Sequence, residues 1–163
     1  MKNLNLKLRM LLTIMACMIL LTYELFAQEK INYKQLRGKE WILQVREGVE
    51  LLMSYTYTID SCFVVAKHSK MRGELKSVYY LSDDWNGTFD DTKVGVSVAG
   101  KYLVEKRNNE EKKKILINVY EILKLTETDL ELRNVEGIEL TEGGEELDRY
   151  KNDIITKYKS KQE

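Results

Sequence analysis

The chain contains one histidine and two cysteines, which limits the chemistry that its side chains can perform. His68 lies in a polar stretch, and no second ligand stands at metal-binding spacing from it, so we expect a solvated loop histidine. Cys62 has no nearby histidine or helix start that would lower its pKa, so we expect a small buried apolar side chain. Neither residue predicts a metal centre or a catalytic nucleophile.

The stretch at residues 83–91 contains four aspartates, and carboxylates of this kind can bind calcium. An EF-hand loop with Gly87 at its sixth position would need an acid at Ser82 and a glutamate at Lys93, and it has neither. We therefore expect a turn, with a weak calcium site as the alternative. The sequence also lacks a glycine-rich phosphate loop, a Gly-x-Ser-x-Gly elbow and paired carboxylates in an apolar frame. It predicts neither enzymatic activity nor a cofactor.

The aromatic residues offer a different kind of chemistry, because tyrosine combines an apolar ring with a hydroxyl. Met53, Tyr55 and Tyr57 recur at every second position, which places them on one face of a strand. Such a face can line a ligand cavity inside a barrel, or it can be ordinary β-core, and the sequence leaves both interpretations open. The candidate ligand-lining residues are Trp41, Met53, Tyr55, Tyr57, Tyr79 and Tyr102.

The first 27 residues are typical of a secretory signal peptide that ends at Ala27. Three basic residues precede an apolar run at residues 10–21, and about 12 apolar residues are too few for the roughly 20 that span a bilayer. The sequence therefore predicts export to the periplasm or the extracellular space, without a stable membrane span after cleavage. Lipoprotein processing at Cys17 is the less favoured alternative.

The remaining residues 28–163 are predicted to form a single domain. The full chain has no net charge, and removal of the signal peptide leaves about −2, so no field would attract a nucleic acid. Cys62 is then the only cysteine, which excludes an intramolecular disulfide.

Short segments with alternating apolar and polar residues dominate this domain, which favours an all-β meander. The clearest alternation covers residues 49–59, and Gly48 separates it from an earlier segment at residues 41–46. Later segments are expected at residues 62–66, 74–81, 94–98, 101–106, 112–125 and 130–135.

Two segments are expected to be helical. Residues 32–36 can form one turn before the first strand. In residues 145–159 the apolar side chains recur at helical spacing, acids crowd the beginning and lysines the end, as the helix dipole prefers. We expect this C-terminal helix to pack against the barrel wall.

Three segments carry a family resemblance: residues 36–41, which read Leu-Arg-Gly-Lys-Glu-Trp, residues 100–104 and residues 115–132. In their order and spacing the chain resembles the lipocalin-like domains of small exported proteins from Bacteroidetes-type bacteria, within the calycin group. Lipocalins stack a late arginine on the first-strand tryptophan. The candidate here, Arg133, alternates away from its apolar neighbours and is expected to point outward.

Pattern and resemblance together predict an up-and-down antiparallel β-barrel of about eight to ten strands, with a short N-terminal helical turn and a C-terminal helix. The first functional hypothesis is a binding protein that holds a small apolar or amphipathic molecule in the barrel lumen. The second is a non-catalytic structural or protein-interaction module of the cell envelope, with a barrel filled by its own side chains.

Overall fold

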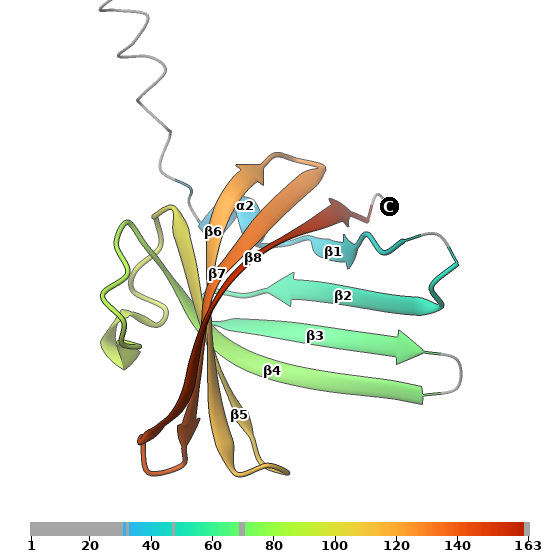
Figure 1. Ribbon diagram of the computed structural model, residues 1–163. Coiled ribbons are helices and arrows are strands. Elements are labelled where there is room, and N and C mark those ends of the chain that lie inside the picture. The colour runs from blue at the N-terminus through green and yellow to red at the C-terminus, as the bar shows by residue number, and fades with distance from the viewer. Residues whose placement is uncertain (1–30, 32, 47, 69–70, 162–163) are drawn as a thin grey trace, which may run out of the picture. The chain divides into compact units, whose positions relative to one another are not determined.

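The computed structural model describes residues 31, 33–46, 48–68 and 71–161 (Figure 1). The predicted signal peptide lies outside these residues. The described chain contains one helical turn, one short 3-10 helix and eight strands. In chain order they are α2 (Tyr33–Leu36), β1 (Glu40–Leu43), β2 (Leu51–Tyr57), β3 (Ser61–His68), β4 (Met71–Ser82), η1 (Asp91–Lys93), β5 (Tyr102–Asn109), β6 (Lys114–Leu125), β7 (Asp129–Thr141) and β8 (Glu146–Ser160).

The eight strands form a closed barrel in which each strand pairs antiparallel with the next one along the chain. β8 then pairs with β1, so neither is left as an exposed sheet edge. The predicted up-and-down antiparallel barrel is confirmed, and so is the helical turn expected at residues 32–36.

Two separate apolar clusters lie on opposite sides of the barrel wall. The inner cluster includes Trp41, Leu81 and Leu132, which are at most 2% exposed. The outer cluster is built around Tyr80 and is covered by residues 83–101, the segment at the left of Figure 1. The apolar residues of the sequence therefore serve two cores, one inside the barrel and one beneath a long loop.

The C-terminal segment is a strand, so the prediction of a helix at residues 145–159 is wrong. β8 pairs with β7 along almost its whole length, and its end pairs with β1. The basic residues near its end form cross-strand ion pairs, Lys157 with Glu131 and Lys159 with Asp129. Backbone pairing to two neighbours therefore outweighs the local helical pattern.

A second correction concerns residues 94–98, which were expected to alternate as a strand. They form a turn and an irregular segment directly after η1, and Gly95 has a φ of 72°. Such a positive φ suits glycine and does not occur in a regular strand. Two valines of this segment cover the barrel instead: Val94 packs against the outer cluster and Val98 against the inner one, while Val96 is exposed.

Candidate functional site

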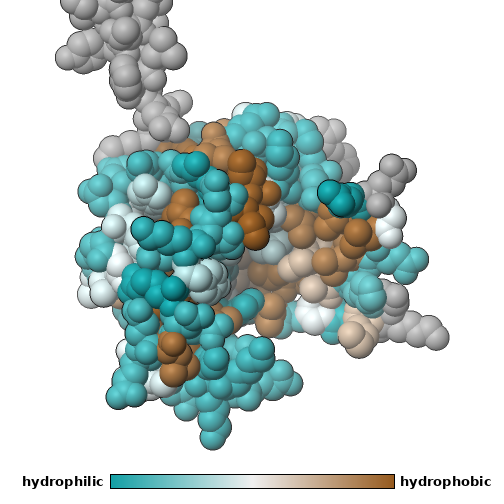
Figure 2. All heavy atoms as spheres, viewed as in Figure 1, coloured by the Kyte–Doolittle hydropathy of each residue, from teal (hydrophilic) through white to brown (hydrophobic). Residues whose placement is uncertain are grey.

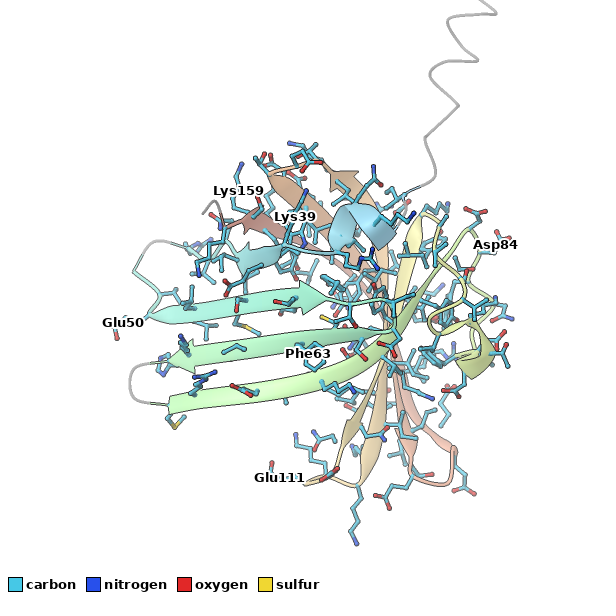
Figure 3. All side chains as sticks on the ribbon, turned by 180° about the vertical axis from the view of Figure 1, so that it is seen from behind. Lys39, Glu50, Phe63, Asp84, Glu111 and Lys159 are labelled. Atoms are coloured by element: carbon cyan, nitrogen blue, oxygen red, sulfur yellow. The ribbon has the colours of Figure 1, made fainter. Side chains whose placement is uncertain are left out.

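Two short strand pairings, here called seams, join the strands β1–β4 to the strands β5–β8. β4 and β5 share only five register pairs, from Val78 opposite Lys106 to Ser82 opposite Tyr102, although β4 has 12 residues. β1 and β8 share three pairs. Beyond these seams β1–β4 and β5–β8 diverge, as Figure 1 shows. Seen from behind in Figure 3, Glu50 and Glu111 mark the far ends of the two groups. The barrel is thus closed at one end and open at the other.

Side chains fill the closed end. Trp41 is fully buried there, and its indole Nε1 donates a 2.9 Å hydrogen bond to the backbone oxygen of Leu36 in the helical turn α2. Tyr79 is also buried, and its hydroxyl donates to the backbone oxygen of Thr58 at 2.6 Å. Side chains that fill the lumen are usual in a barrel of eight strands. We therefore look for a ligand site at the other end.

A slot of about 830 Å³ opens where β4 and β5 separate. Strand alternation directs Leu75 and Ser77 of β4 and Arg107 of β5 from its walls toward the inside of the barrel. Apolar residues of the inner face remain exposed at this end, with Leu75 at 44% and Ile154 at 60%. In Figure 2 apolar residues line the hollow between the two groups of strands. The lining of the slot itself is mostly polar, with Glu74 and Lys76 among its residues, so the apolar surface of the open end comes from these exposed residues of the inner face.

A carboxylate lies on the inner face next to residues that line this slot. Glu105 is opposite Tyr79 on one side and Asn118 on the other, and it accepts a hydrogen bond from the hydroxyl of Ser77. Burial raises the pKa of Glu105, while the Ser77 hydrogen bond and the positive charge of Arg107 act in the opposite direction. Among the described residues, no cation lies within ion-pair distance of Glu105.

Four tyrosines share the inner face with this carboxylate: Tyr55 and Tyr57 of β2, Tyr120 of β6 and Tyr158 of β8. The rings of Tyr55 and Tyr158 meet edge to face with 5.0 Å between their centroids. Burial is the main cause that raises the pKa of each of these tyrosines, and the negative charge of Glu105 adds to it. All four hydroxyls therefore remain protonated at physiological pH and can both donate and accept hydrogen bonds.

One acceptor inside the barrel is unsatisfied. Asn134 of β7 lies opposite Tyr120 in the register, and its side chain hydrogen-bonds the tyrosine hydroxyl. Its Oδ1 atom is buried and has no hydrogen-bond partner, the only such side-chain atom among the described residues. A buried acceptor without a partner costs about 1–3 kcal/mol. The interior therefore holds a position that a ligand donor can fill.

No family model, curated protein or solved structure matches the chain. Within the described residues no helix has the length and apolarity needed to cross a membrane. Any function has to follow from the residues of the barrel themselves.

The candidate residues predicted from the sequence lie in three places. Met53, Tyr55 and Tyr57 are brought together on the inner face of β2. Trp41 and Tyr79 belong to the packed closed end. These two groups share the lumen, and the tyrosine ring of Tyr57 contacts that of Tyr79 with centroids 5.3 Å apart.

Tyr102 lies apart from the other candidates, so its placement in the lumen is corrected. It alternates with the inward-facing Leu103, packs against the outer cluster and lies beneath the ammonium group of Lys101. The sequence prediction missed Glu105, Tyr120, Asn134 and Tyr158. One signal was available for Glu105, which stands two positions after Leu103 on the same strand face.

The other residues considered for chemistry have structural roles. Cys62 is fully buried, and burial raises the pKa of its thiol, so it remains protonated. His68 is exposed at the end of β3. In the acidic stretch, Asp90 accepts a hydrogen bond from the backbone of Thr92 at the start of η1, and Asp91 forms an ion pair with Lys106. Arg133 pairs with Glu121 on the outer face, as expected.

Proposed function

We propose that this protein binds a small amphipathic molecule at the open end of its barrel, without catalysis. The observation that carries the proposal is the combination of exposed apolar side chains on the inner face with polar residues beneath them. Binding sites for small molecules are usually concave and mostly apolar, with a few polar groups that orient the ligand. Leu75 and Ile154 supply the exposed apolar surface, and Glu105 and Asn134 supply polar groups below it.

The family and the location form part of the same proposal. An eight-stranded antiparallel barrel with a filled closed end is the architecture that the lipocalin resemblance implies, and the outward-facing Arg133 is one departure from it. We propose export through the signal peptide at residues 1–27, to the periplasm or the extracellular space. A soluble carrier in these compartments needs an interior that shields apolar ligands from water.

A second candidate function is a protein-interaction module. The observation that favours it is a groove of about 320 Å³ on the outer face, lined by apolar residues such as Phe89 and Ile138 and by the charged Arg149. Residues 146–160 form a strand and offer no helical surface, so this groove is the partner surface in the alternative. The two functions use opposite faces of the barrel wall and can be separated by substitutions.

The test compares two neighbouring positions on β3. Ala66 lies on the inner face opposite Met53, and Val65 lies on the outer face opposite Ser54. Ala66→Trp should fill the open end and weaken binding of the neutral fluorescent probe N-phenyl-1-naphthylamine at least tenfold. Val65→Trp, the matched control, should bind the probe like the wild-type protein. Equal binding by all three proteins, or no binding by the wild type, would overturn the proposal.

A further inference from the structure

The charge inside the barrel indicates which head group a ligand would carry. Glu105 has no ion-pair partner among the residues that the structure describes, and its single hydrogen bond comes from the neutral Ser77. A carboxylate in a partly dry site with a neutral partner is stabilised by an incoming cation. Glu105 therefore offers one half of an ion pair.

The tyrosines around Glu105 favour the same sign of charge. The face of an aromatic ring is negative and attracts ammonium groups, most strongly where water is excluded. Tyr55, Tyr120 and Tyr158 belong to or pack against the inner cluster, on the same face as Glu105, and the negative charge of Glu105 contributes to the raised pKa of each. Aromatic rings and a carboxylate together form the kind of site that recognises organic cations.

Arg107 is the residue that would favour an anion instead. It faces the same slot two positions further along β5, nearer the strand end and solvent. Glu105 still lies within the pairing of β4 and β5, opposite Tyr79, whereas Arg107 lies beyond it and belongs to the opening.

The unsatisfied acceptor narrows the class of cation further. Asn134 Oδ1 can only accept a hydrogen bond, so the group that fills it must be a donor. A primary or secondary ammonium carries N–H donors, whereas a quaternary ammonium has none. The exposed Leu75 and Ile154 at the opening match an apolar chain attached to that head group.

We propose that the barrel binds an amphipathic amine, with its protonated nitrogen between Glu105, Asn134 and the tyrosine rings and its apolar chain at the open end. This inference rests on the proposed binding function and specifies its ligand class. It predicts a preference for charge and for N–H donors that an apolar cavity alone would not show.

The experiment uses ligands that share a ten-carbon chain and differ in the head group. Calorimetric titration at pH 7.5, below micelle-forming concentrations, compares decylamine, decyltrimethylammonium, decanol and decanoate. Decylamine should bind at least tenfold more tightly than decanol and decanoate, and more tightly than decyltrimethylammonium. Glu105→Gln should abolish the preference over decanol. Glu121→Gln, on the outer face of the neighbouring strand, should retain it.

Each outcome separates this inference from the proposed function. Binding of decanoate or decanol as tight as that of decylamine overturns the amine inference but leaves a binding protein. Failure of all four ligands to bind, together with failure of the neutral probe, overturns both. If Glu105→Gln does not fold, Asn134→Leu provides the second test, because it removes the unsatisfied acceptor along with the amide group that hydrogen-bonds Tyr120. Unchanged decylamine affinity in Asn134→Leu would contradict the role of that residue.

Discussion

Gly137 of β7 lies directly beneath the ring of Tyr150 on β8. The two residues are opposite each other in the register, and a Cβ atom built on Gly137 would lie 2.2 Å from Cζ of the tyrosine. The ring thus occupies the space that any larger residue at position 137 would need. This cross-strand contact fixes the register of the strand that the sequence pattern had indicated as a helix.

Gly137→Ala should therefore destabilise the protein, because the Tyr150 ring has to move out toward solvent. We expect a loss of about 1–3 kcal/mol in the free energy of unfolding, measured by urea denaturation. Gly73→Ala is the control, since a Cβ on Gly73 of β4 meets nothing within 4 Å. The control should be as stable as the wild type or slightly more stable. Equal stability of both variants would contradict this packing.

Gly100→Ala should have a larger effect, because the obstacle is backbone. The new Cβ would lie 2.2 Å from the carbonyl carbon of Ser82, next to the seam between β4 and β5, and the φ of 152° is also unfavourable for alanine. We expect a loss of at least about 3 kcal/mol. Gly144→Ala has a φ of 88° but no close neighbour, so it should lose only about 1 kcal/mol. Thermal melts of the two variants check the difference.

The strand pattern was predictable wherever one face met the core at every second residue. Met53, Tyr55 and Tyr57 alternate without interruption, and the structure places them side by side on the inner face. β8 was not predictable in this way, because a register shift between Asn134 and Glu136 of its partner strand interrupts the alternation. The interrupted pattern then matched a helical period by coincidence.

The polar interior was harder to predict because it depends on residues far apart in the chain. Ser77 and Glu105 are 28 positions apart and meet only when β4 and β5 pair. A charged residue such as Glu105 in an isolated strand is typical of the solvent face. Apart from its place two positions after Leu103, nothing in the local pattern indicated that Glu105 faces inward, and its partners became visible only in the closed barrel.

The two ends of the barrel should differ in how much each buried side chain stabilises the fold. Leu132 is 2% exposed in the inner cluster, and Ile154 on the adjacent strand is 60% exposed at the open end. Leu132→Ala should cost about 2–5 kcal/mol. Ile154→Ala should cost less than about 1 kcal/mol, because most of that side chain already contacts water. Similar losses in both, measured by chemical denaturation, would mean that the open end is packed.

The predicted signal peptide has a direct test in the mature mass. Protein recovered from the cell envelope or the medium should begin at Gln28, because cleavage is expected after Ala27. Intact-mass spectrometry of the secreted chain measures this without assumptions about the fold. A diacylglycerol adduct on Cys17 would instead establish the lipoprotein alternative.

Glu105 and Asp129 should affect the pH dependence of the free energy of unfolding in opposite directions. Burial raises the pKa of Glu105, so the native state keeps its proton to a higher pH than the unfolded state, whose glutamate pKa is about 4.3. Above that pH the ionisation of Glu105 lowers the free energy of unfolding. Glu105→Gln removes this penalty. Its melting temperature should therefore rise relative to the wild type between pH 4 and pH 8.

Asp129 should show the reverse sign. The Lys159 ammonium and the Thr128 hydroxyl lower the pKa of this carboxyl to about 2, so its stabilisation is complete above the unfolded pKa of about 3.9 and is lost as the pH falls through 2. The melting temperature of Asp129→Asn should thus fall relative to the wild type as the pH rises from 2 to 5.

The Glu105 prediction has its own contradicting outcome. Parallel melting curves of Glu105→Gln and the wild type across pH 4–8 would show that Glu105 is solvated in the native state. The amine site would then lose the partly desolvated carboxylate on which it depends.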